Sequence, residues 1–173
     1  MGAPSELGPV DPQIFRVSEQ GSRVYSAYSL VKGYRTLFNE AVASKGRLEP
    51  YLQQLAKYDI RDIISFENSI KLSEEIAKKI LSTGMMEGKT LDAIKKKIGI
   101  FLDPDAGTIS HGRSINCEEA KNCGLNIQKL DVDSSFWRHI YELYVRTDWF
   151  VTNRALKAIE SKDGAFHVPL PRS

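Results

Sequence analysis

His111 is the residue of this sequence best suited to acid–base chemistry. It lies between Ser110 and Gly112 in the loop-like stretch "LDPDAGTISHGRSI". An imidazole near its ordinary pKa of about 6.5 can act as a general base if a serine hydroxyl comes within about 3 Å. Asp11 and Asp103 could orient the ring, although the Asp-Pro pair at Asp11 is equally typical of a turn. A surface or hydrogen-bonded structural histidine is the alternative interpretation, and His111 taken alone favours it.

The other residues with ligand chemistry do not have the spacing of a metal site. Cys117, Cys123 and His111 match no zinc pattern, and no fourth ligand accompanies them. The run "DPDAG" from Asp103 begins like a calcium loop, but Ser114 stands where the bidentate acid is expected. The sequence therefore predicts reduced structural cysteines, no metal and no cofactor.

Common catalytic motifs are also missing from the sequence. It contains no Gly-x-Ser-x-Gly turn, no glycine-rich phosphate loop and no His-Glu-x-x-His pair. His139 and His167 stand in contexts that suggest no role. A catalytic reading of His111 therefore requires a nucleophile from elsewhere.

The composition is that of a globular, cytoplasmic protein. The 173 residues are 42% hydrophobic and 27% charged, with a net charge of +2 and both signs interspersed. This mixed charge gives no support to a nucleic-acid partner. No run approaches the roughly 18 apolar residues of a membrane span, and no signal peptide opens the chain. We expect one domain with its own core.

Hydrophobic periodicity predicts a chain made mainly of helices. Apolar residues recur every three or four positions from an N-cap at Ser22 to a stop at Gly46. Further helices are predicted over 47–58, from an N-cap at Asp59 to Gly84, from Thr90, and over 116–124. Residues 136–151 carry two apolar stripes, which is typical of a helix that is sandwiched or lies in an interface. Gly33, inside the first helix, predicts a close neighbour because glycine costs about 1 kcal/mol there.

Strand-like stretches are few. "QIFRV" (13–17) alternates like a short strand, and another short strand is expected after the loop around His111. The count is five or six helices with two or three short strands, followed by a polar tail over 162–173 that we expect to fray. Because these strands do not complete a sheet, we expect their partners to lie outside the chain.

Three stretches resemble one known family. "SELGPVDPQ" resembles the loop after the nucleophile-bearing helix of the serine dehydrogenase proteinase family, which is related to the Clp proteolytic subunit and has a crotonase-like fold. "RLEPYLQQLAKYD" with the helix that follows resembles the helical region of that family. "ISHGRSINCEEAKNCGL" resembles its closing strand and helix. The resemblance covers about residues 1–130.

The resemblance implies an α/β crotonase-like fragment that is predominantly helical. Residues 1–161 would be the C-terminal helical portion of the domain, starting after the parallel strands and the catalytic serine. The intact protein would be a hydrolase that cleaves a peptide or protein substrate, and the chain alone would be inactive. His111 would lie near the acidic triad position, with Asp11 as an orienting carboxylate. The usual histidine of the Clp subunit has no counterpart here, which puts the usual Ser-His-Asp connectivity in doubt. The alternative is a helical interaction module that forms a homo-oligomer through the helix over 136–151.

Overall fold

The computed structural model describes residues 1–18, 21–103 and 114–170, and the chain divides into two compact units. The central unit is Glu6–Ile127, and the terminal unit joins Met1–Ser5 to Gln128–Ser173. About half of the described residues are helical. In the described residues, no helix has the length and apolar character needed to span a bilayer. Each unit is built around its own elements.

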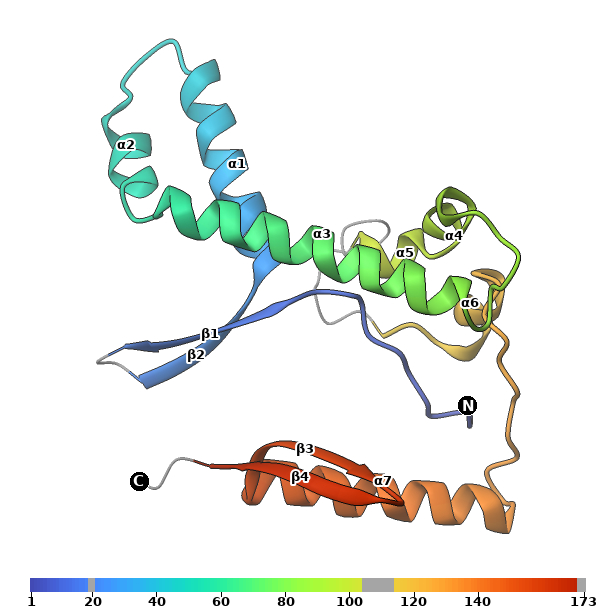
Figure 1. Cartoon of the computed structure of the whole chain (residues 1–173). Helices are drawn as coiled ribbons and strands as arrows, with labels where there is room; N and C mark the ends of the chain where they lie inside the picture. Colours follow the sequence, from blue (N-terminus) through green and yellow to red (C-terminus); the bar gives the residue numbers. More distant parts are fainter. Residues whose placement is uncertain (19–20, 104–113, 171–173) are drawn as a thin grey trace. The chain divides into compact units, whose positions relative to one another are not determined.

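The central unit opens with an antiparallel hairpin of β1 (Gln13–Ser18) and β2 (Gly21–Ser26) (Figure 1). The strand predicted over 13–17 is confirmed as β1. Ile14 packs against the core, whereas the cross-strand pair Phe15 and Val24 is largely exposed. The hairpin thus buries one face only.

The first helix, α1 (Ala27–Ala43), begins later than its sequence predicted. The expected N-cap, Ser22, belongs to β2, and Ser26 caps the helix by accepting the Ser29 N–H at 3.0 Å. Val24 fits the three- and four-residue spacing of the apolar residues of α1, so the sequence pattern does not show where β2 ends and α1 begins. Pairing of the β-branched Val24 with β1 decides the local structure instead.

Helix α1 packs against α2 (Glu49–Leu55) and the long α3 (Ile60–Ser82) (Figure 1). The predicted N-cap Asp59 is confirmed, because its carboxylate accepts the Arg61 N–H at 2.9 Å. The Arg61 side chain donates to the same carboxylate and lowers the pKa of Asp59 to about 2. The core between these helices consists of Ala27, Val31, Ile63 and Phe66.

Gly33 lies where α1 approaches Tyr58. A Cβ at this position would stand 3.2 Å from the Tyr58 hydroxyl, a contact tighter than most side chains accept. The close neighbour predicted from the sequence is therefore present. Tyr58 also meets the ring of Tyr34 edge-on, with 5.7 Å between centroids.

Three short helices complete the central unit: α4 (Leu91–Lys97), α5 (Gly99–Leu102) and α6 (Cys117–Asn122). Thr90 caps α4, as predicted. Asn116 and Glu119 form a reciprocal capping box at α6. Gly124 follows α6 with a φ of +80°, a conformation that favours glycine, so its predicted stop is confirmed.

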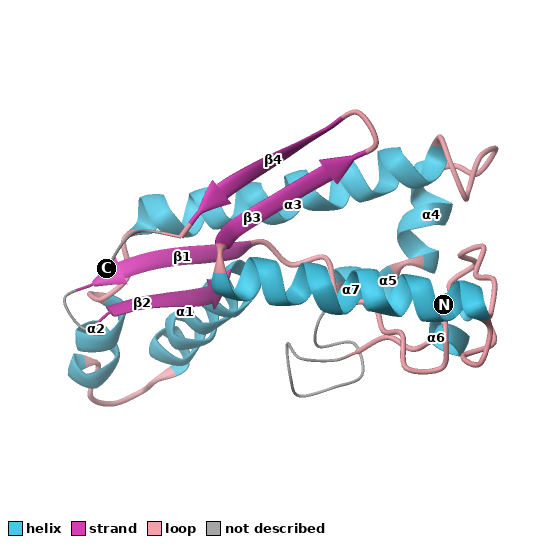
Figure 2. Ribbon diagram, turned by 90° about the horizontal axis from the view of Figure 1, so that it is seen from below, coloured by secondary structure: helices cyan, strands magenta, loops and turns pink. Residues whose placement is uncertain are grey.

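The terminal unit contains α7 (Ser135–Asn153) and the antiparallel hairpin of β3 (Ala155–Ser161) and β4 (Gly164–Pro169) (Figure 2). The sequence predicted a fraying polar tail from residue 162, but residues 164–169 are β4. Pairing with β3 supplies the backbone hydrogen bonds that a tail lacks. Helix α7 contacts β3, and the His167 ring of β4 lies 4.8 Å from that of Phe150.

The start of the chain belongs to this terminal unit. The Leu130 N–H donates to the Met1 carbonyl at 2.9 Å. Gly2 lies so close to the Trp137 ring that a Cβ would stand 2.5 Å from it. Only a residue without a side chain fits this position.

Candidate functional site

Asp11, one of the two residues expected to take part in catalysis, lies just before the hairpin and is half-buried. Its Oδ1 accepts the Tyr28 N–H at 3.3 Å, and its Oδ2 accepts from the Gln13 side chain at 3.0 Å. The first of these bonds satisfies an N–H in the opening turn of α1, where a carboxylate also meets the positive end of the helix dipole. The described geometry therefore gives Asp11 the structural role of anchoring α1.

Tyr28 also reaches the second candidate carboxylate. Its hydroxyl donates to Oδ1 of Asp103 at 3.3 Å, across 75 residues of sequence. Tyr28 therefore bonds to both carboxylates considered as partners of His111: to Asp11 through its backbone N–H and to Asp103 through its hydroxyl. His111 itself lies outside the described residues.

Leu7 and Ile115 join the two most distinctive stretches of the sequence. The Leu7 N–H donates to the Ile115 carbonyl at 2.9 Å, and the Ile115 N–H donates to the Leu7 carbonyl at 2.8 Å. This antiparallel bridge stands apart from the two hairpins. Ile115 is 1% exposed, so the bridge is anchored by a buried side chain. Leu7 of "SELGPVDPQ" is thus paired with Ile115 of "ISHGRSINCEEAKNCGL".

The opening stretch has a second anchor. The Val10 N–H donates to the Phe101 carbonyl of α5 at 2.7 Å, and Phe101 is buried. Leu7 is therefore bonded to Ile115, Val10 to Phe101 of α5, and the Pro12 carbonyl accepts the Ala27 N–H of α1.

Cys117 and Cys123 are both buried and form no disulfide. Burial raises the pKa of the Cys123 thiol, which keeps it protonated and weakly reactive. Among the described residues, no three histidine, cysteine or carboxylate side chains gather as a metal site would need. This arrangement fits structural thiols.

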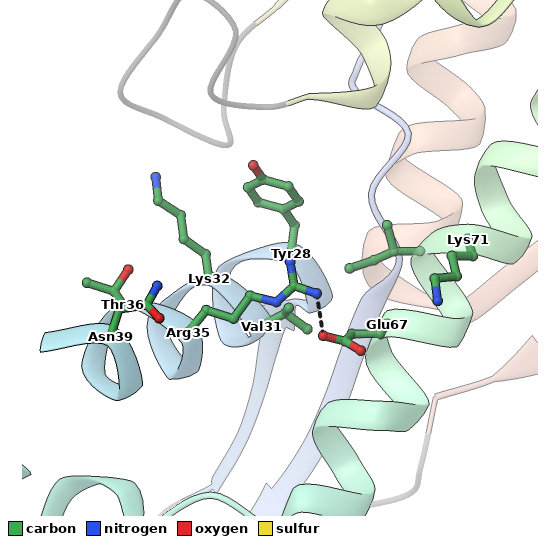
Figure 3. A pocket seen from close by; sticks show the side chains of 9 residues that line it. Tyr28, Val31, Lys32, Arg35, Thr36, Asn39, Glu67 and Lys71 are labelled. Atoms are coloured by element: carbon green, nitrogen blue, oxygen red, sulfur yellow. Dashed lines mark hydrogen bonds and ion pairs between the residues drawn. The ribbon is translucent and has the colours of Figure 1, made fainter. Parts of the chain in front are cut away.

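A pocket of about 270 Å³ lies between α1 and α3, with Tyr28 at its edge (Figure 3). We call it the α1–α3 pocket. Val31, Ile70 and the Tyr28 ring supply its apolar surface. Its polar lining is Lys32, Arg35, Thr36, Asn39, Glu67 and Lys71.

An ion pair crosses the pocket. Nη2 of Arg35 on α1 donates to Oε1 of Glu67 on α3 at 2.6 Å, and the two side chains point toward one another in Figure 3. Within the described residues, the lining carries three cations, Lys32, Arg35 and Lys71, and the carboxylate of Glu67, so it has an excess of positive charge. This charge excess favours an anionic ligand.

Sequence reasoning missed this pocket. The signal was present in part, because Tyr28, Lys32, Arg35 and Asn39 are spaced four, three and four residues apart and so share one helix face. Their partner Glu67 is 32 residues from Arg35. Nothing local in the sequence sets that pairing.

No protein-family model, no curated protein and no solved structure matches the chain.

Proposed function

We propose that the chain is the C-terminal helical portion of a Clp-like serine peptidase with a crotonase-like fold. The observation that carries this proposal is the Leu7–Ile115 bridge. The two stretches that resemble the serine dehydrogenase proteinase family most specifically are about a hundred residues apart in sequence, yet Leu7 of the first pairs with Ile115 of the second. A chance likeness in two loops gives no reason for them to meet. Two buried, free cysteines agree with the reducing cytoplasm in which we place the protein.

The intact protein would hydrolyse peptide bonds through an acyl-enzyme. A serine outside these 173 residues would attack the peptide carbonyl while its hydroxyl proton passes to a base, for which His111 is the candidate. The base then gives that proton to the leaving amine. Water next attacks the acyl-enzyme while the base takes the water proton, and return of this proton to the serine releases the acyl group as a carboxylic acid. Asp11 already accepts two hydrogen bonds, so in this scheme it positions α1 more than it orients His111.

The test compares this chain with the longer polypeptide encoded in frame upstream of Met1. A fluorophosphonate probe should label a serine of the longer protein and none in residues 1–173. In the longer protein, His111→Ala should lower the rate of hydrolysis of a fluorogenic peptide by about 10²–10⁴-fold. The matched control His139→Ala, on the exposed surface of α7, should leave the rate unchanged. Hydrolysis by the isolated chain, or a stop codon directly upstream of Met1, would contradict the proposal.

A second candidate function is a non-catalytic interaction module that forms a homo-oligomer, and α7 carries it. None of the 19 residues of α7 is fully buried. Phe136, Leu143 and Tyr144 are each more than 60% exposed. The hairpin adds an exposed cross-strand pair, Ile159 and Phe166. Apolar surface on this scale marks an interaction site more often than a free surface.

Light scattering tests this second function. The chain should elute as an oligomer at about 50 µM, and Leu143→Lys should shift it toward the monomer. Thr152→Lys adds the same charge at an exposed polar position of the same helix and should leave the oligomer intact. A chain that remains monomeric up to about 200 µM would rule out self-association.

A further inference from the structure

We propose that the α1–α3 pocket binds a peptide segment through its C-terminal carboxylate, with an apolar last side chain. Arg35 and Lys71 supply the charge, and Val31 and Ile70 supply the apolar contact. Binding there requires no nucleophile, so the inference stands apart from the peptidase proposal and from self-association.

The Arg35–Glu67 pair shows that a carboxylate fits this place. Glu67 lies 2.6 Å from the guanidinium, which binds planar carboxylates well because its N–H groups form a fixed fork. The Arg35 side chain is 65% exposed, so a ligand can approach it. Lys71 lines the same pocket, and within the described ranges it forms no ion pair with a carboxylate.

Hydrogen-bonding capacity favours a peptide carboxylate over a phosphate. Charge does not discriminate between them, because the cations of the lining attract a dianion more strongly while Glu67 beside Arg35 repels it more strongly. Thr36 and the Asn39 amide both donate and accept hydrogen bonds, as the N–H and C=O groups of a peptide require. A phosphate offers mainly acceptors and would use half of this capacity.

Size and polarity favour a short segment. At about 270 Å³ the pocket is slightly smaller than typical small-molecule sites. It can therefore take one or two residues of a peptide. Val31 is 6% exposed and is held in place by its packing in the core. It therefore gives an apolar side chain a fixed surface to contact.

The experiment is an amide NMR titration of the full chain with N-acetyl-alanyl-leucine and with its C-terminal amide. The free acid should bind in the millimolar range and shift the amides of residues 31–39 and 67–71. Removing the ligand's charge should weaken binding about fivefold or more, because two exposed cations each contribute a modest factor. Equal affinity of the acid and the amide, shifts confined to other residues, or no saturation by about 20 mM would each overturn the proposal.

Two variants and one further ligand sharpen the result. Lys71→Gln should weaken binding of the acid about threefold, whereas Lys79→Gln, two turns further along α3, should leave the affinity unchanged. Arg35→Lys keeps the charge but loses the fork, so it should also weaken the acid and leave the amide unaffected. Inorganic phosphate should compete poorly. If phosphate displaces the acid at equal concentration, the pocket attracts any anion and recognition of a peptide carboxylate is refuted.

Discussion

Replacing Glu74 with glutamine tests how α4 is held against α3 in the central unit. Oε1 of Glu74 accepts from Lys78 on α3 at 2.8 Å and from Lys95 on α4 at 2.7 Å. Glu74 is 22% exposed and Lys95 is 54% exposed, so water screens the cross-helix pair more than the pair within α3. Gln keeps the shape and one acceptor but removes the charge.

The size of the effect follows from this exposure. A partly exposed pair lies near the upper end of the range for surface salt bridges, so Glu74→Gln should lower the free energy of unfolding by about 1 kcal/mol. For a chain of this size that corresponds to a fall in Tm of about 2–4 °C. Glu75→Gln, on the neighbouring position of the same helix, is the control and should change stability by less than about 0.5 kcal/mol.

The dependence on pH gives the sharper test. Burial raises the pKa of Glu74, but the hydrogen bonds from Lys78 and Lys95 outweigh it, so the pKa lies below its ordinary value of 4.5. A lowered folded-state pKa means that the stabilisation is present above about pH 4.5 and is lost as the pH falls through the folded-state value. The wild-type chain and Glu74→Gln should therefore differ in stability at pH 7, and the difference should shrink as the pH falls below 4.5.

Urea denaturation and hydrogen exchange provide the measurements. Because Phe101 follows α4 and holds Val10, loosening α4 should also reduce exchange protection of the Val10 amide. A difference between wild type and variant that stays constant as the pH is lowered until Glu74 is protonated would show that packing, not charge, is responsible. Equal stability of the wild type and Glu74→Gln at pH 7 would refute the idea that the Glu74 ion pairs hold α4 against α3.

The remaining predictions concern the core, a helix cap and a thiol. Phe66→Ala should lower the free energy of unfolding by about 3–5 kcal/mol in urea titrations, because the ring is 8% exposed in the main core, and an effect below about 1 kcal/mol would show that this core is loosely packed. Asn116→Ala should cost about 1 kcal/mol, since it leaves the first N–H groups of α6 unpaired, whereas Asn122→Ala at the other end of α6 should cost less. Iodoacetamide should alkylate Cys123 slowly in the folded chain and quickly in urea, because burial both shields the thiol and raises its pKa; equal rates would contradict that burial.

The helices were predictable from local signals. Asp59, Thr90 and Asn116 each carry an oxygen that caps a helix, and each begins a helix in the structure. Such caps act within four residues, so a sequence contains everything that determines them. The same is true of Gly124, whose positive φ ends a helix.

The hairpins were harder to predict because pairing competes with helical periodicity. Val24 fits the apolar stripe of α1 yet pairs with Phe15 in β2. The second hairpin was missed because its two-residue turn, Lys162-Asp163, is not the Asn-Gly or Asp-Gly pair that signals such turns most strongly. Ile159 and Phe166 face each other across this hairpin but lie seven residues apart in the sequence, so no local pattern links them.

The candidate sites depend on distant pairs that no local pattern determines. Tyr28 reaches Asp103 across 75 residues, and Arg35 reaches Glu67 across 32. Each of these residues alone looks like an ordinary member of a solvated helix face or loop. The roles of His111 and of a serine beyond this chain stay predictions.

The terminal unit contains residues from both ends of the sequence, and this arrangement sets an order of assembly during synthesis. Residues 6–127 leave the ribosome before Leu130 and Trp137 exist, so the central unit can fold while the first five residues still lack their partners. The terminal unit cannot form before residues 128–137 have been made, so the central unit can fold before it does.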